Sequence, residues 1–185
     1  VNLTEAGTLG KVIRSFKKNP DKIRNLKVSG PITTEDFYFM RDSMAILEAI
    51  NLKEAKVVNA DFCMNQYGDD RNNRPDIIPY LAFKGKKTLS HFSFPEKITH
   101  ICASAFEDTN ISGALIIPED VLEIGYGAFQ KTLIGSVALS PRLEKIYDYA
   151  FYYCRALTGT LYLPETLTYI DQSEFGECPF TGELH

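Results

Sequence analysis

The second half of the chain repeats with a period of 22 to 24 residues, and this periodicity constrains the fold more than any other feature. A phenylalanine column recurs at intervals of 23, 22 and 24 residues, at Phe106, Phe129, Phe151 and Phe175. An isoleucine column keeps the same intervals, at Ile101, Ile124, Ile146 and Ile170. A third apolar column shifts in step with both, at Ile98, Val121, Leu143 and Leu167. Three columns that drift together indicate a repeated structural unit.

The repeat extends beyond these four copies in both directions. Ile78 and Phe83 lie 23 residues before Ile101 and Phe106, which adds an earlier coil. Towards the other end, residues 180–184 mirror residues 157–161, so that residues 181–185 read as the start of a further coil. We therefore expect a regular array over residues 77–180.

Each unit combines an extended, alternating stretch, a proline turn, a second short extended piece and a tight turn that carries the phenylalanine. The few apolar side chains of one unit cannot offset the conformational entropy of ordering it alone. The units must therefore stack and share their apolar columns, which predicts a solenoid of parallel strands about 4.8 Å apart.

The first part of the chain is less regular but related to the array. Residues 23–28 and 47–52 both fit the pattern LxxLxL, so we expect the first two strands of the sheet there. Residues 59–76 are polar and depart from the period, which predicts a surface loop. The prediction is a single structural domain with irregular coils over residues 23–76.

Two helices are predicted before and between these strands. Leu9, Val12, Ile13 and Phe16 follow helical spacing, with Thr8 as a candidate N-cap and Pro20 as a stop. We expect this helix to lie in residues 1–22 and to cap the first coil. A second helix is expected over residues 34–43, with Phe37 and Met40 on one face.

Composition excludes several classes of function. The formal net charge is -4, with 20 Lys and Arg against 24 Asp and Glu, which disfavours nucleic acid as a partner. The longest apolar run in the repeated half, residues 114–117, is far short of the roughly 18 to 20 residues that cross a bilayer. We expect no membrane span.

The columns also identify a family resemblance. The pattern LxxFxFPxxIxxIxxxAFxxT/C over residues 77–185 resembles the BspA-like leucine-rich repeat proteins, which are secreted and cell-surface proteins of oral and gut anaerobic bacteria. Pro95, Pro118 and Pro164 match this pattern, and so do the Phe-x-x-Cys ends at residues 151–154 and 175–178. Ser140 shifts one proline by a position, which suits a degenerate repeat.

The resemblance implies a fold and a type of function. The fold is an α/β leucine-rich-repeat solenoid with parallel β-strands, short turns and helices, and an N-terminal capping helix. The location is extracellular or at the cell surface, and the partner is a protein or a glycan. The resemblance implies no catalysis and no cofactor.

Exposed tyrosines are the candidate binding residues. Seven of the ten tyrosines lie between Tyr126 and Tyr169. Four of them stand at offsets from the isoleucine column that do not require burial in the core, namely Tyr126, Tyr147, Tyr149 and Tyr169. Tyr162 alternates with two leucines and is expected to project beside Ile116 of a neighbouring coil. Exposed aromatic side chains on a rigid surface favour macromolecular binding, although packing along the ridges between coils is the competing interpretation.

Other candidate sites favour structural roles. Cys154 and Cys178 share a column with Thr109 and Thr132, which predicts free thiols that meet buried backbone groups, although a disulfide between adjacent coils is conceivable. The three histidines show neither metal-ligand spacing nor a nucleophile with a third partner, so no catalytic or metal site is predicted. The cluster at residues 84–87 is expected to be a charged turn.

Two alternatives to a binding module stay open. An incomplete last coil suggests a structural spacer within a longer surface protein, and its unpaired edge suggests an edge-mediated homodimer. An enzyme with its site near residues 59–76 is the third hypothesis, and a buried carboxylate or histidine in a pocket there would support it.

Overall fold

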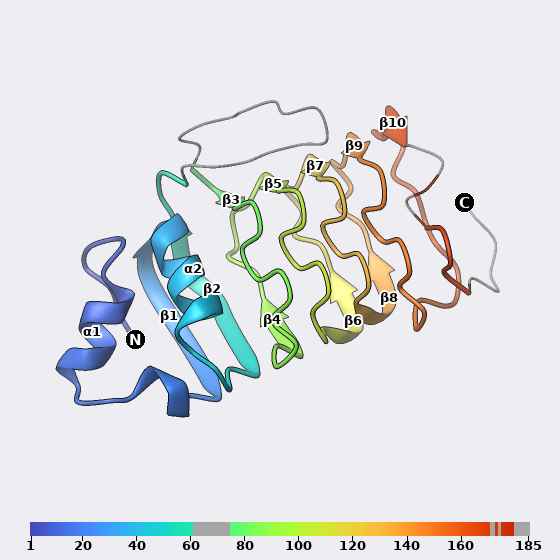
Figure 1. The fold of residues 1–185 in the computed structure, drawn as a ribbon. Coiled ribbons are helices and arrows are strands. Elements are labelled where there is room, and N and C mark those ends of the chain that lie inside the picture. Colours follow the sequence, from blue (N-terminus) through green and yellow to red (C-terminus); the bar gives the residue numbers. More distant parts are fainter. Residues whose placement is uncertain (61–74, 171–172, 174, 180–185) are drawn as a thin grey trace.

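The protein is a parallel β-solenoid whose coils follow one another from the N-terminal to the C-terminal end (Figure 1). The computed structural model describes residues 1–60, 75–170, 173 and 175–179. The N-terminal end contains α1 (Leu9–Ser15), the 3-10 helix η1 (Pro20–Lys22) and α2 (Thr34–Asp42). This arrangement confirms the predicted solenoid with an N-terminal helix.

Two rows of parallel strands form the sides of the solenoid. The long-strand wall contains two sheets, which are β1 (Asn25–Ile32), β2 (Ala49–Val57) and β4 (His91–Ser93), then β6 (Ser112–Ile116) and β8 (Leu133–Ala138). The short-strand wall is one sheet of β3 (Ile77–Ile78), β5 (His100–Ile101), β7 (Glu123–Ile124), β9 (Lys145–Ile146) and β10 (Tyr169–Ile170). Both predicted N-terminal strands are present and are longer than expected.

The sequence columns become physical rows in the structure. Along the short-strand wall, strand register pairs five isoleucines in order, Ile78, Ile101, Ile124, Ile146 and Ile170. Backbone pairing of identical residues is what a one-coil shift of the same unit requires. The register therefore confirms the alignment of the repeats.

The phenylalanine column is a continuous stack of rings. Successive centroids from Phe83 through Phe106, Phe129 and Phe151 to Phe175 lie 5.6, 5.2, 5.2 and 5.3 Å apart. The interplanar angles are 22°, 3°, 10° and 6°, so the rings are close to parallel. The stack confirms the shared interior row on which the fold prediction depended.

Tight turns hold each phenylalanine in place. The residues two before and two after the ring adopt positive φ, as at Ser104 (53°) and Asp108 (60°) around Phe106. The same pair recurs at Tyr149 (60°) and Tyr153 (61°) around Phe151. Left-handed backbone in non-glycine residues is costly, so the stacked rings and neighbouring coils must hold these turns.

The N-terminal helices are tied together by one carboxylate that the sequence did not reveal. Buried Asp36 accepts hydrogen bonds from the backbone N–H groups of Gly7 (2.7 Å), Leu9 (2.9 Å) and Thr33 (3.0 Å). The Thr8 hydroxyl instead donates to the Glu5 carbonyl. Asp36 therefore satisfies backbone donors at the beginning of both α1 and α2.

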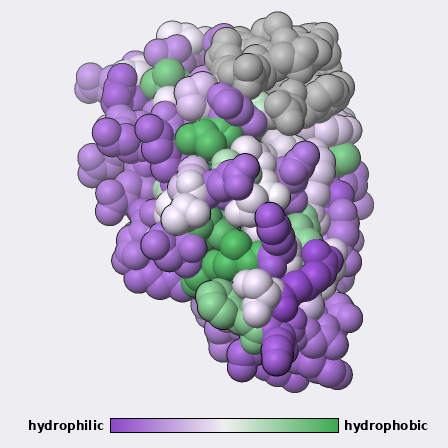
Figure 2. Space-filling view, turned by 90° about the vertical axis from the view of Figure 1, so that its left-hand side faces the viewer, coloured by the Kyte–Doolittle hydropathy of each residue, from purple (hydrophilic) through white to green (hydrophobic). Residues whose placement is uncertain are grey.

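The apolar face of α1 is shorter than its sequence spacing suggested. Leu9 and Ile13 are buried, but Phe16 follows the helix and is 64% exposed, which corrects its expected place on the capping face. Phe37 and Met40 of α2 are fully buried, as predicted. Figure 2 shows that the N-terminal end of the solenoid is largely hydrophilic, with small groups of hydrophobic side chains.

One lysine joins α2 to the first regular coil. The Lys86 ammonium group donates to the carbonyls of Arg41 (2.9 Å) and Met44 (2.8 Å) near the end of α2. Burial lowers the pKa of Lys86 from its ordinary value, while Asp42 acts in the opposite sense. The predicted charged turn at residues 84–87 is present with Lys84 and Lys87 exposed, whereas Lys86 is only 7% exposed.

Candidate functional site

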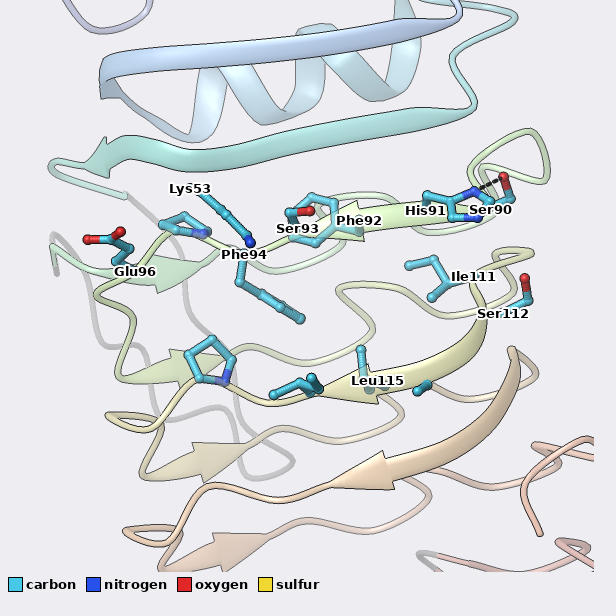
Figure 3. Close-up of a pocket in the computed structure, with 14 residues that line it drawn as sticks. Lys53, Ser90, His91, Phe92, Ser93, Phe94, Glu96, Ile111, Ser112 and Leu115 are labelled. Carbon is cyan, nitrogen blue, oxygen red and sulfur yellow. Dashed lines mark hydrogen bonds between the residues drawn. The ribbon is translucent and has the colours of Figure 1, made fainter.

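The long-strand wall is interrupted by a groove between β4 and β6. The groove has a volume of about 530 Å³, within the usual range of ligand-binding pockets. One side is formed by residues 90–94 and the other by residues 111–116, and Lys53, Pro95, Glu96 and Pro118 lie at one end. Figure 3 shows Phe94 and Leu115 on opposite sides of this gap.

The groove narrows to a point where the two coils still touch. The Ser112 N–H donates to the Ser90 carbonyl at 3.3 Å. Beyond this bond, β4 pairs with β2, and β6 pairs with β8, in two separate sheets. The result is a wedge that is closed at Ser90 and Ser112 and opens towards Phe94 and Pro118.

Bulky rings lie where the two sheets separate. Phe92 and Phe94 are 5.0 Å apart, and they contact Phe106 at 4.8 and 5.7 Å. In the next coil the same two repeat positions are Leu115 and Ile117. Two aromatic side chains in an otherwise aliphatic column are the sequence signal for this groove, which the sequence analysis missed together with Lys53.

Charged groups gather at the open end. Lys53 and Glu96 line both the groove and an adjacent hollow of about 380 Å³. Lys56, Lys97, Glu54 and Asp76 complete the polar lining of this hollow. Glu54 forms an ion pair with Lys27 at 2.5 Å. Lys53, Lys56 and Lys97 form no ion pair within the described part of the chain.

Two sequence-predicted binding residues are strongly exposed on the long-strand wall. Ile116 is 71% exposed and lines the groove between β4 and β6. Tyr162 is 70% exposed and follows buried Leu161, as the alternation predicted. Pairing places Ile116 beside Ala138. Exposure makes these two side chains available to a partner, and their role in binding stays a prediction.

The remaining predicted tyrosines pack against one another. Tyr126 and Tyr149 are half-buried with centroids 5.5 Å apart, and Tyr149 also contacts Tyr152 at 5.2 Å. Tyr147 lies 5.7 Å from Tyr169. Tyr147 is only 5% exposed, which corrects its expected position outside the core, since it follows β9 directly and lies next to a buried isoleucine.

The Tyr126 hydroxyl is affected by this packing. Burial raises the pKa of Tyr126, and the neighbouring Tyr149 acts in the same direction. A raised pKa keeps the phenol protonated well above neutral pH. The Tyr126 hydroxyl therefore offers a neutral donor beside the ring of Tyr149.

The cysteine column has the predicted structural role. Cys154 and Cys178 are free thiols, and their sulfur atoms donate to the carbonyls of Phe129 and Phe151, each at 3.1 Å. The Thr132 hydroxyl donates to the same Phe129 carbonyl at 2.9 Å. A hydrogen bond with Cys154, together with burial, raises the pKa of Cys178.

A different cysteine is oxidised. Cys102 is disulfide-bonded and 1% exposed, and its partner cysteine lies outside the described residues. The hypothesis of a site at residues 59–76 falls largely on residues 61–74, which also lie outside the described part of the chain.

The polar groups of the groove can bind but lack the parts of a catalytic triad. His91 Nδ1 lies 2.9 Å from the Ser90 hydroxyl, and no described carboxylate pairs with this imidazole. A second histidine, His100, lies 3.8 Å from Glu123 on the other wall. No group of three metal-ligating side chains occurs within residues 1–60 and 75–170 or the other described positions.

Comparison with known proteins agrees with the geometry. The family model for the BspA type leucine rich repeat region matches residues 76–182 with six copies. Comparison with the curated proteins finds no match. Within the described part of the chain, no helix has the length and apolar character needed to span a bilayer. The family match covers more than half of the sequence and coincides with the stacked coils, so the chain belongs to the BspA-type leucine-rich repeat family, whose repeats form protein-interaction modules.

Proposed function

We propose that the chain is a non-catalytic binding module, displayed at the cell surface or secreted, that attaches to a protein partner through its long-strand wall. The observation that carries this proposal is the exposure of Ile116 at the edge of the groove. Tyr162 adds a large exposed ring on the same side of a rigid solenoid. Exposed apolar side chains beside a concave surface are typical of protein-interaction sites.

The location outside the cytoplasm is supported by cysteine chemistry. The disulfide at Cys102 persists where the surroundings are oxidising, as outside the cell or in a periplasm. Of the two free thiols, Cys154 is buried and Cys178 half-buried, and both are hydrogen-bonded to backbone carbonyls. Both observations fit an exported protein.

A selection experiment tests the binding face. The biotinylated chain is immobilised and panned against a phage-displayed library of random dodecapeptides, and in parallel against an array of glycans. The same procedure is applied to the double variant Ile116→Glu, Tyr162→Glu. A matched control, Glu144→Ala, changes an exposed side chain just before β9 on the other wall.

We expect the unmodified chain and the control to enrich the same peptides, and the double variant to lose binding by at least about tenfold, because charge replaces apolar contact area. Circular dichroism and thermal unfolding of each variant verify that the fold is kept. Equal binding by the double variant rejects this face. Binding to the glycan array without peptide enrichment replaces the protein partner with a carbohydrate.

A further inference from the structure

We propose that the groove between β4 and β6 binds an extended peptide segment that carries an acidic residue, with the peptide backbone lying along the strand edges and the carboxylate at Lys53. This inference rests on the proposed function and names the chemistry of its partner. It concerns a single site, defined by the wedge between Ser90 and Pro118 and its charged open end.

The first argument is the interrupted backbone ladder. The His91 N–H donates to the Glu48 carbonyl on the β2 side at 3.1 Å. Because successive residues of a strand face opposite neighbours, the N–H and C=O of Phe92 face β6. On the opposite edge, the Ile117 N–H donates to the Ala138 carbonyl at 2.9 Å, so the backbone groups of Ile116 face β4.

These facing groups are not bonded to each other. After the Ser112–Ser90 bond, a parallel ladder would continue from the Phe92 N–H to the Ser112 carbonyl. The ladder does not continue in this way, because no bridge joins β4 to β6 and the two belong to separate sheets among the described strands. Strand edges with open donors and acceptors are what an extended peptide pairs with when it adds to a sheet.

The second argument is the lining of the wedge. Phe92, Phe94 and Leu115 supply apolar surface on both sides of the gap (Figure 3), and Ile116 adds to this lining. Phe94 is 8% exposed and is held by two ring contacts, so its side is already ordered before a partner binds. A preformed apolar wall lowers the entropic cost of binding and suits alternate side chains of an extended peptide.

The third argument is charge complementarity. The ammonium groups of Lys53, Lys56 and Lys97 lie around the open end, and none forms an ion pair within the described part of the chain. Among the described residues, Glu96 and Asp76 also line this hollow and form no ion pair. The described side chains at the open end thus have a surplus of positive charge on a chain of net charge -4, which favours an acidic side chain or a terminal carboxylate.

The closing experiment uses synthetic peptides of known sequence. Four fluorescein-labelled hexapeptides of alternating valine and threonine are titrated with the full chain by fluorescence anisotropy. Two carry one glutamate, at the amino end or at the carboxyl end, and two carry lysine at the same positions. A fifth peptide repeats the better glutamate sequence with N-methyl groups on alternate residues, which removes backbone donors and keeps the side chains.

Charge reversal at the open end is tested with a matched control. Lys53→Glu changes the charge at the groove, whereas Lys11→Glu makes the same change on the exposed side of α1. Both side chains are exposed, so both variants are expected to fold. Titrations at about 50 and 300 mM salt separate contact at Lys53 from long-range attraction.

We expect a glutamate peptide to bind the unmodified chain at least about tenfold more tightly than the matching lysine peptide. Lys53→Glu should reverse this preference, and Lys11→Glu should leave it unchanged. N-methylation should weaken binding by about tenfold or more, because each removed donor is one lost hydrogen bond.

Three results overturn the inference. Absence of saturable binding by both glutamate peptides rejects the groove as a strand site. Binding that tolerates N-methylation rejects backbone pairing. Equal effects of Lys53→Glu and Lys11→Glu reject contact at Lys53. The dodecapeptide selection stands apart from all three, because peptides enriched through Ile116 and Tyr162 would support the proposed function even where these results exclude strand addition.

Discussion

The N-terminal coils and the regular array are held together by different forces. β1 and β2 pair in parallel over seven residue pairs, whereas neighbouring short strands of the array pair over two. The array adds two kinds of contact to its short strands. Backbone hydrogen bonds join the turns of neighbouring coils, as from the Phe106 N–H to the Ala128 carbonyl at 2.7 Å, and side chains stack, above all in the row from Phe83 to Phe175. Periodic columns and short, repeated backbone contacts can therefore stand in for long strands, provided that every coil contributes its member.

The N-terminal coils instead depend on contacts that occur once. Asp36 accepts hydrogen bonds at the N-termini of two helices, and Lys86 donates to two carbonyls near the C-terminal end of α2. Gly30 lets residues 1–3 lie against β1, with the Leu3 N–H donating to the Ser29 carbonyl at 2.8 Å. Contacts of this type have no neighbouring copy that could take over their role.

The largest expected effect tests the stacked column. Phe106→Ala removes a fully buried ring that contacts Phe83, Phe129 and the two groove phenylalanines. The free energy of unfolding, measured by urea denaturation, should fall by about 3–5 kcal/mol. Phe175→Ala, at a half-buried ring of the last described coil, should lose clearly less. Equal losses at the two positions would show that the column is not a cooperative core.

An intermediate effect is expected at a matched pair of glycines, with Gly30 in the N-terminal coils and Gly113 in the array. A Cβ at Gly30 (φ 86°) would lie 2.0 Å from the Leu3 carbonyl oxygen, whereas a Cβ at Gly113 (φ 78°) meets nothing within 4 Å. Gly113→Ala should cost about 1 kcal/mol, from its left-handed backbone alone. Gly30→Ala should cost more than about 2 kcal/mol, since the backbone must also move.

Thermal unfolding of both glycine variants measures this difference. If the two variants lost the same stability, the close approach of residues 1–3 to β1 would not contribute to the N-terminal coils. The Gly113→Ala variant is also informative about the groove. If its fold is unchanged, β6 tolerates substitution.

The smallest expected effect lies in the cysteine column. Cys154→Thr places in one coil the residue that Thr132 supplies in the coil before it, where the hydroxyl donates to the carbonyl of the phenylalanine three residues earlier. We expect a change of less than about 1 kcal/mol in the free energy of unfolding, because threonine can bond the Phe151 carbonyl in the same way. Cys154→Val, which cannot donate, should lose more. The reverse order would show that packing, and not the hydrogen bond, selects residues in this column.

Much of the array could be predicted from the sequence, because its columns report contacts between residues one period apart. The isoleucine register and the ring stack follow directly from that spacing. For the N-terminal coils, the helices and strands could be predicted but the contacts between them could not. Asp36 joins residues 7, 9 and 33, and their spacing follows no repeat.

The candidate site was predicted only in part. Ile116 and Tyr162 were found because strand alternation places them outside, and Tyr147 was misplaced because the offset from the isoleucine column does not describe the turn after β9. The groove was not predicted, because it lies where the repeat is imperfect. A period describes what successive coils share, whereas a binding site uses what one coil does differently.

The carboxylate of Asp36 has a consequence for how the N-terminal end opens. Loss of α2 would leave the N–H groups of Gly7 and Leu9 without their acceptor, and loss of α1 would leave the buried Asp36 carboxylate with fewer donors. The two helices are therefore thermodynamically linked and should unfold as one cooperative unit. In native-state hydrogen exchange, the amides of Gly7, Leu9 and Thr33 would then share a single opening free energy, although 26 positions separate the first from the last.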